Sequence, residues 1–204
     1  MIILIIGESG AGKTRACKSL GTDAVIMQGI RKRLPFSEKT STVFFVESLE
    51  KLAASINRAL ASNDKNIFVI DDFQNLILKK LIFGSKKDKF QCYVDVAEDV
   101  QALLDAAENS DKRFYFLMHE EIGENQKLAA LTAGKLLKEK FKFEGFFTVV
   151  LRAVKEEAGY LFYSDDAVSV AKAPEGIFEK KFMENDIAAV DQAICNFYGI
   201  KKGG

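Results

Sequence analysis

The sequence predicts an α/β fold, in which helices flank a mostly parallel β-sheet. Short apolar runs alternate along the chain with segments of helical periodicity, the pattern of stacked βα units. The first apolar run, residues 1–6, leads directly into a glycine-rich segment, as expected of a central strand buried on both faces. The chain has 204 residues, 48% of them hydrophobic, which is enough for one well-cored domain. We expect that domain to span residues 1–204.

The predicted strands are short and apolar. They lie at Ile2–Ile6, Ala24–Met27, Asn66–Ile70, Arg113–Met118, Phe146–Val154 and Tyr160–Tyr163. The last two flank the polar stretch Lys155–Gly159, which ends in glycine. A C-terminal β-hairpin is therefore expected there.

The predicted helices are marked by apolar residues at three- and four-residue steps, as in Leu49, Leu52, Ile56 and Leu60. They span Lys13–Leu20, Glu47–Ser62, Val94–Glu108, Lys127–Lys140 and Asp186–Tyr198. Each follows a predicted strand or a loop, which completes the βα alternation.

The overall charge predicts no particular partner. The 29 basic and 29 acidic side chains cancel to a formal net charge of zero. Any contact with nucleic acid would therefore come from a local patch and not from a basic protein as a whole.

Signals for zinc binding and for secretion are missing from the sequence. Cys17, Cys92 and Cys195 lie far apart, and His119 is the only histidine, so a zinc site lacks its usual ligands. The N-terminal apolar run has no basic region before it and stops after six residues at Gly7. This argues against a signal peptide or a membrane span, and we expect a cytoplasmic protein.

The glycine-rich segment GESGAGKT matches the phosphate-binding pattern G-x-x-x-x-G-K-[ST] in full. Its glycines let the backbone approach a ligand, and a helix opening near Lys13 would point free N–H groups at phosphate. Lys13 would supply charge to the β and γ phosphates, and the Thr14 hydroxyl a ligand to Mg²⁺. The alternative is a glycine-rich turn without a ligand. The expected nucleotide-binding residues are Gly7, Glu8, Ser9, Gly10, Ala11, Gly12, Lys13, Thr14 and Arg15.

Two carboxylates follow the predicted strand that contains IFVI. Asp71 would face the magnesium ion through water, and Asp72 would lie next to the γ-phosphate and orient the attacking water. Alternatively, the pair begins a turn or caps a helix. The phosphate loop upstream favours the metal and catalytic roles.

His119 ends the next predicted strand, FYFLMH. In P-loop ATPases the strand beside the acidic strand commonly ends in a polar residue that senses the γ-phosphate, and an imidazole can donate to phosphate or water. A structural histidine with satisfied hydrogen bonds is the alternative.

ATP is the expected nucleotide. The N-K-x-D motif typical of GTP specificity is absent, and NDKN at residues 63–66 has the letters in another order. A small-molecule kinase would need an arginine-rich lid, and only Arg31 and Arg33 share a plausible lid segment. A kinase is therefore disfavoured, but this segment leaves it open.

Taken together, the motifs resemble those of RecA-like P-loop ATPases encoded in phage replication and recombination modules, near the single-strand-annealing accessory ATPases. After GESGAGKT the resemblance rests on VIDDFQ, MHEE, LTAGKLL and AKAPEGIFE, in this order, and covers nearly the whole chain. It implies a RecA-like core that uses Mg²⁺ and ATP and works as a ring or filament on single-stranded DNA. It also implies an annealing or replication protein as a possible partner, in a host-cell cytoplasm.

The same resemblance implies that a basic residue reaches the γ-phosphate bound by a neighbouring subunit. Lys172 in the AKAPEG segment is the first candidate for this role, and Arg152 on the preceding strand is the second. A surface residue without a special partner is the alternative for both.

Two lysine-rich segments are candidate DNA contacts. In the first, Lys79, Lys80, Lys86, Lys87 and Lys89 surround Phe83, Gly84 and Phe90 in a stretch expected to be loop-like. Lysines neutralise phosphates and aromatic rings stack bases, which suits a single strand. The second segment contains Lys127, Lys135, Lys138, Lys140 and Lys142, and a solvated amphipathic helix is the alternative for it.

A rival hypothesis for the whole protein is a nucleotide-gated loader that hydrolyses ATP negligibly.

Overall fold

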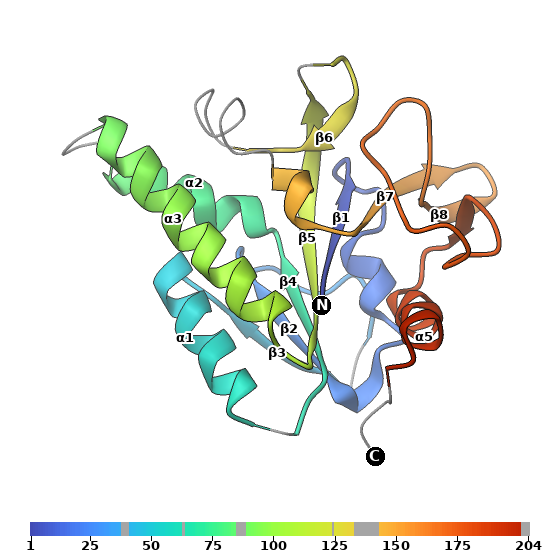
Figure 1. Cartoon of the computed structure of the whole chain (residues 1–204), viewed down its shortest axis with the longest axis horizontal. Helices are drawn as coiled ribbons and strands as arrows, with labels where there is room; N and C mark the ends of the chain where they lie inside the picture. Colours follow the sequence, from blue (N-terminus) through green and yellow to red (C-terminus); the bar gives the residue numbers. More distant parts are fainter. Residues whose placement is uncertain (38–40, 63, 85–88, 124, 133–142, 201–204) are drawn as a thin grey trace.

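The computed structural model of the chain describes residues 1–37, 41–62, 64–84, 89–123, 125–132 and 143–200. These residues form a nine-stranded sheet in the order β3-β2-β4-β5-β1-β7-β8-β9, with β6 off this path and paired to β5 (Figure 1). The strands are β1 (Ile2–Gly7), β2 (Ala24–Gln28), β3 (Thr42–Phe45), β4 (Ile67–Asp71), β5 (Arg113–Ile122), β6 (Leu128–Ala130), β7 (Val149–Glu156), β8 (Gly159–Tyr163) and β9 (Phe182–Glu184).

Six consecutive strands of this sheet, from β3 to β7, run parallel. The pairs β5–β6, β7–β8 and β8–β9 are antiparallel. The predicted α/β class, the mostly parallel sheet and the C-terminal hairpin are therefore confirmed. The hairpin joins β7 to β8 and turns at residues 157–158, within the predicted polar stretch.

Helices cover both faces of the sheet (Figure 1). On one face lie α1 (Leu49–Leu60), α2 (Phe73–Gly84) and α3 (Lys89–Glu108); on the other lies α5 (Ile187–Tyr198). Three short 3₁₀ helices accompany them: η1 (Thr14–Cys17), η2 (Gly21–Asp23) and η3 (Phe143–Phe146). None of the helices in the described part of the chain is long and apolar enough to cross a membrane.

The helices α1 and α5 begin where their sequences provide an N-cap. The Ser48 side chain accepts a hydrogen bond from the backbone N–H of Lys51 at the start of α1. The Asp186 carboxylate accepts from the N–H groups of Ala188 and Ala189 at the start of α5. These caps fix the starts of two helices that the sequence pattern predicts to within two residues.

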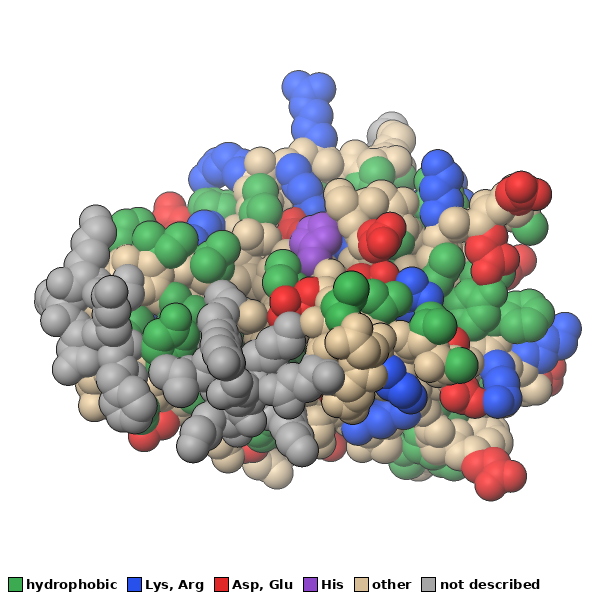
Figure 2. Space-filling model, turned by 90° about the horizontal axis from the view of Figure 1, so that it is seen from above, with side chains coloured by type: hydrophobic (Ala, Val, Ile, Leu, Met, Phe, Trp, Pro, Cys, Tyr) green, Lys and Arg blue, Asp and Glu red, His purple; other side chains and the backbone are tan. Residues whose placement is uncertain are grey.

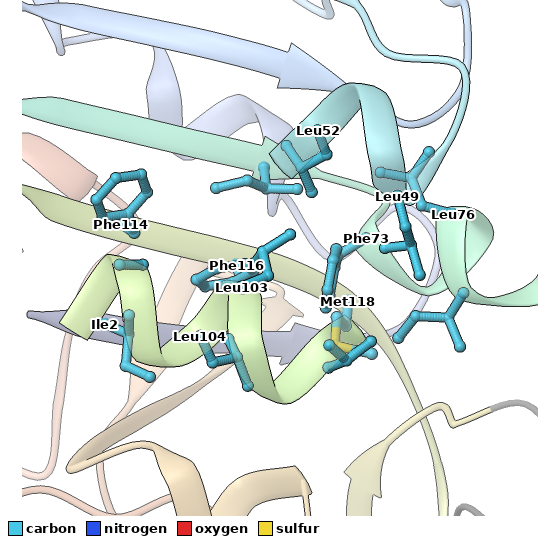
Figure 3. Packing of buried hydrophobic residues seen from close by; sticks show 14 of the residues in the cluster. Ile2, Leu49, Leu52, Phe73, Leu76, Leu103, Leu104, Phe114, Phe116 and Met118 are labelled. Atoms are coloured by element: carbon cyan, nitrogen blue, oxygen red, sulfur yellow. The ribbon is translucent and has the colours of Figure 1, made fainter. Parts of the chain in front are cut away.

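The core is divided by the sheet into two apolar clusters, because alternate residues of each strand face opposite sides. Within β1, Leu4 packs under the α1–α3 layer and Ile5 under the α5 layer, and both are fully buried. Figure 3 shows the first cluster, in which Phe116 meets Phe73 edge-on at a ring distance of 5.0 Å. Burial on both faces holds the carboxyl ends of the central strands in fixed positions.

Several elements differ from the sequence predictions. The helix predicted over Lys13–Leu20 is only the 3₁₀ turn η1, and a second 3₁₀ turn, η2, begins at Gly21, whose φ is 66°. Phe146–Val154 is a strand only from Val149 onward, after the turn η3. The helix predicted over Lys127–Lys140 is wrong at its start, since residues 128–130 form β6; residues 133–142 lie outside the described ones.

The lysine-rich stretch 79–90 is not loop-like where the structure describes it. Lys79 and Lys80 belong to α2, which continues to Gly84, and α3 begins at Lys89. Residues 85–88 lie outside the described ones. The apolar residues of α2, three of which stay exposed, obscure the helical period that would have predicted it.

Candidate functional site

The segment Gly7–Thr14 forms a loop at the carboxyl end of β1. Gly10 and Gly12 have φ of 84° and 95°, values that favour glycine. A Cβ on Gly12 would lie 2.6 Å from Cδ1 of Tyr160, so the hairpin presses against the loop. Gly7 does not have a positive φ; its hydrogen is needed because a Cβ would lie 2.7 Å from the carbonyl oxygen of Ala153.

Lys13 folds back across this loop. Its Nζ donates hydrogen bonds to the carbonyl oxygens of Gly7 at 2.7 Å and of Glu8 at 2.9 Å, while the residue is only 7% exposed. Burial lowers the pKa of Lys13 to about 8, although the charges of Asp71 and Asp72 act in the opposite direction. Because η1 has only four residues, the cationic ammonium and the loop amides, rather than a helix terminus, are the groups that favour an anion here.

The acidic pair lies at the end of β4, beside this loop. The Thr14 hydroxyl is 3.0 Å from Oδ1 and 2.9 Å from Oδ2 of Asp71, to which it donates. Asp71 is fully buried, and this burial raises the pKa of its carboxyl. Thr14 and Asp71 are hard oxygen donors in direct contact, which fits Mg²⁺.

No cluster of three or more His, Cys, Asp or Glu side chains suited to a metal ion occurs among the described residues. A metal ion at Thr14 and Asp71 would therefore depend on water and phosphate oxygens for its remaining ligands. Mg²⁺ in phosphate-transferring proteins is commonly bound in this way, by one or two protein side chains together with water and phosphate oxygens.

Asp72 has a strained backbone, with φ of 60°, that turns its side chain toward His119 and Lys32. Its Oδ1 lies 3.5 Å from Nε2 of His119, and its Oδ2 lies 2.5 Å from Nζ of Lys32. Burial raises the pKa of Asp72, but hydrogen bonds from His119 and Lys32 outweigh burial and lower that pKa to about 2. Asp72 is thus a fixed, ionised acceptor.

His119 lies next to the phosphate loop because β5 separates β1 from β4. In the parallel register His119 is opposite Gly7, while Leu117 two residues earlier is opposite Asp71. The strand continues past His119 to Ile122, so the prediction that it ends at Met118 is wrong. Figure 2 looks onto this edge of the sheet and shows the histidine, in purple, at the surface between basic and acidic side chains.

A cavity of about 470 Å³ joins these groups. Ser9, Gly10, Gly12–Arg15, Asp72 and His119 line it, together with Lys32, Arg33, Pro35 and Tyr160. The Arg15 guanidinium stacks over the Tyr160 ring, 4.7 Å from its centre. Ala11 is buried in the core, and the exposed Glu8 borders a neighbouring cavity. Most residues that the sequence predicted for the nucleotide therefore lie at one cavity.

Neither candidate trans-acting residue lines this cavity, although Arg152 borders the neighbouring cavity that Glu8–Ala11 also line. Arg152 donates to both carboxylate oxygens of Glu120, from Nε at 2.9 Å and from Nη2 at 3.1 Å, and its Nη1 lies 3.4 Å from Asp166. Lys172 is exposed, pairs through its backbone with Val150 and borders a different cavity of about 410 Å³. A role for Arg152 in a neighbouring site would require breaking its bidentate ion pair.

The lysines proposed for DNA do not form one patch in the described residues. The Lys80 ammonium pairs with Glu50 and with Asp99. The Lys79 ammonium donates to the carbonyl oxygen of Gly29 at 2.8 Å and lies over the ring of Phe45. Phe83 is 71% exposed, and Lys127 is exposed in the turn before β6. Lys135, Lys138, Lys140 and Lys142 lie outside the described residues, as do Lys86 and Lys87; the Lys89 and Phe90 side chains are likewise not described.

Sequence reasoning missed Lys32 and Tyr160 as site residues. The register that pairs Gln28 with Asp71 brings the segment after β2 to the carboxyl edge of β4. Tyr160 comes to the same edge because β8 runs back from the end of β7. Both placements follow from the strand order, which no local pattern of residues specifies.

Comparison with known proteins gives no match: no protein-family model fits this chain, and no curated protein matches its sequence. What the cavity can do is therefore inferred from its own geometry.

Proposed function

We propose that this chain is a Mg²⁺-dependent P-loop ATPase with a RecA-like core. The observation that carries the proposal is the meeting of Lys13, Thr14, Asp71, Asp72 and His119 at the carboxyl edge of three adjacent strands. A glycine-rich turn without a ligand would not explain why a buried lysine faces two buried carboxylates and a histidine.

In this proposal Lys13 and the loop amides bind the β and γ phosphates, and Thr14 and Asp71 hold Mg²⁺. Bound Mg²⁺ would neutralise the charge that develops on the phosphate oxygens. Asp72 accepts a hydrogen bond from the attacking water and orients it, because a carboxyl with a pKa of about 2 is a weak base at neutral pH. His119, whose Nε2 lies 3.5 Å from Asp72, would turn its N–H from Asp72 to the terminal phosphate when nucleotide is bound. Phosphoryl transfer relies on such positioning more than on proton abstraction.

The Asp72→Asn variant separates hydrolysis from mere binding. Asparagine tolerates the positive φ of Asp72, so the backbone is kept while the charge is removed. We expect turnover to fall at least about tenfold with nucleotide affinity nearly unchanged, since a reacting group misplaced by about 1 Å can lose about 100-fold in rate. Asp111→Asn, on the exposed turn before β5, is the matched control. Negligible turnover in both Asp72→Asn and the wild type would support the loader hypothesis, in which ATP only orders loops, whereas equal and substantial turnover would contradict the role of Asp72.

The pKa of Lys13 makes nucleotide binding depend on pH. In the free protein this pKa is about 8, and an adjacent polyphosphate raises it. Binding at pH 8 should therefore take up about half a proton, more at pH 8.5 and almost none at pH 6.5. Calorimetry of ADP binding in buffers of different ionisation enthalpy measures this uptake. Lys13→Arg keeps the charge and should bind ADP without uptake; proton release by the wild type at pH 8 would contradict the assignment.

We also propose that single-stranded DNA stimulates this ATPase, with an assembly of several copies acting in phage recombination or replication. Support comes from the resemblance of the sequence motifs to those of RecA-like ATPases and from the lysine-rich stretch 79–89. Hydrolysis measured with and without single-stranded DNA, at low and moderate salt, tests this directly. Stimulation that weakens with salt is the expected result, because counterions compete for phosphate contacts. Hydrolysis indifferent to DNA would leave an ATPase with a protein or small molecule as its partner.

A further inference from the structure

Lys32 places a positive charge between the two carboxylates of the site. Its Nζ lies 2.5 Å from Oδ2 of Asp72 and 3.2 Å from Oδ2 of Asp71. The two carboxylate side chains are 4% and 1% exposed, whereas the lysine side chain is 36% exposed. The Lys32 ammonium therefore lies between the solvent and the two buried carboxylates.

The ammonium lies where the proposed metal ion would bind, because it contacts the carboxylate of Asp71. Oδ2 of Asp71 also accepts the Thr14 hydroxyl, at 2.9 Å. Thr14 and Asp71 are the two residues whose oxygens fit Mg²⁺. A divalent cation bound to this carboxylate, with its water shell, would occupy the space that the Lys32 ammonium now fills. Like charges at such short range also repel strongly in a partly buried site.

Lys32 is able to leave. It belongs to a loop after β2, residues 29–37, that has no helix or strand in the structure. The loop borders the same cavity, through Lys32, Arg33 and Pro35. A swing of the flexible lysine stem would free the two carboxylates without moving the sheet.

We infer that Lys32 is the resident counter-cation of the acidic pair and that a divalent cation must displace it to reach Asp71. This inference rests on the proposed function, because it concerns the metal position of the nucleotide site. Lys32 makes binding of the free metal ion weak until phosphate oxygens provide further ligands, and so couples the arrival of the metal ion to that of the nucleotide. Lys32 is a positioning residue in this scheme.

Binding of Mn²⁺ to the nucleotide-free protein tests the inference, with free Mn²⁺ measured by electron paramagnetic resonance. Lys32→Met removes the ammonium but keeps the length of the side chain. We expect this variant to bind Mn²⁺ about tenfold more tightly than the wild type, because the ion no longer displaces a partly exposed ion pair. Arg33→Met removes the same charge from the same loop and cavity, and should change Mn²⁺ affinity less than about twofold. Equal affinities in Lys32→Met and the wild type, or equal gains in both variants, would overturn the inference.

Two further measurements guard against a folding defect. Lys32→Met removes the ammonium that contacts both buried carboxylates, so its thermal unfolding temperature should be lower than that of the wild type in chelator and rise more on adding Mn²⁺. Lys32→Gln, whose amide still donates to Asp72, replaces it if the methionine variant does not fold. Binding of ADP distinguishes the two proposals. If the Lys32 variants bind ADP like the wild type but show unchanged Mn²⁺ affinity, only the role of Lys32 is refuted. If Lys13→Ala binds ADP as tightly as the wild type, the nucleotide site itself is refuted.

Discussion

Replacing Lys13 with alanine is expected to weaken binding of Mg·ATP by about 100-fold or more, since charge-assisted hydrogen bonds to phosphate contribute several kcal/mol in a partly buried site. Lys13 is the one loop side chain whose ammonium already lies within the phosphate loop, bonded to the carbonyl oxygens of Gly7 and Glu8. Removing it takes away the cation that faces the phosphates and leaves those two carbonyl groups to water.

The fold should survive this substitution. Burial opposes the charged form of Lys13, as its lowered pKa of about 8 shows, so its removal also relieves a desolvation cost. Lys18→Ala, on the exposed side of the next turn, is the matched control and should bind nucleotide like the wild type. Equilibrium binding of a fluorescent ATP analogue, with thermal unfolding of each variant, measures both effects. Equal affinities in the two variants would remove the basis for a nucleotide site.

Replacing Asp191 with alanine is expected to lower the free energy of unfolding by about 3–5 kcal/mol, the range for breaking one side of a buried ion pair. Asp191 on α5 is fully buried and lies 2.6 Å from Nε of Arg113, which is 2% exposed at the start of β5. Its Oδ1 also accepts the hydroxyl of the fully buried Tyr115, at 2.9 Å. The variant leaves a buried cation and a buried hydroxyl without their acceptor.

Urea denaturation of three variants tests the role of this pair. Gln192→Ala, on the exposed side of the same helix, should cost less than about 0.5 kcal/mol, as most surface substitutions do. The double variant Arg113→Met and Asp191→Ala should recover part of the loss, because an apolar pair avoids the uncompensated charge. A loss below about 1 kcal/mol in Asp191→Ala would mean that water reaches Arg113 in the folded protein.

The central strands could be predicted because each is buried on both faces and therefore appears in the sequence as a continuous apolar run. This holds for β1, β4 and β5, whose predicted bounds differ from the observed ones by one to four residues. Strands β6 and β9 have three residues each, and β3 is largely exposed at the edge of the sheet. Elements so short or so exposed carry little hydrophobic pattern, which explains why they were missed.

Helix α2 was missed for a different reason. Its buried residues include Leu76, Ile77 and Leu81, while Leu78 and Ile82 on another side are 42% and 53% exposed. Apolar side chains on its exposed side as well as its buried side weaken the contrast between the faces of the helix, on which the periodicity depends. Lys79 and Lys80 of this helix were consequently assigned to a loop.

The site was predictable where a motif sits at the end of a strand. Thr14, Asp71 and His119 come together because parallel strands end at one edge of the sheet. Lys32 was not predictable in this way, since its contact with Asp72 depends on the path of a loop without regular structure. The strand order that brings that loop to Asp71 arises from packing over the whole sheet and not from local sequence.

Steady-state hydrolysis of ATP by the purified wild-type protein, with Lys13→Ala measured in parallel, tests the central claim most directly. The account predicts that the wild type releases phosphate in a reaction that requires Mg²⁺ and stops in chelator. Lys13→Ala should release no more phosphate than a sample without protein. Phosphate release by the wild type that does not exceed that of Lys13→Ala, at saturating Mg·ATP with and without single-stranded DNA, would contradict the assignment of this cavity as an ATPase site.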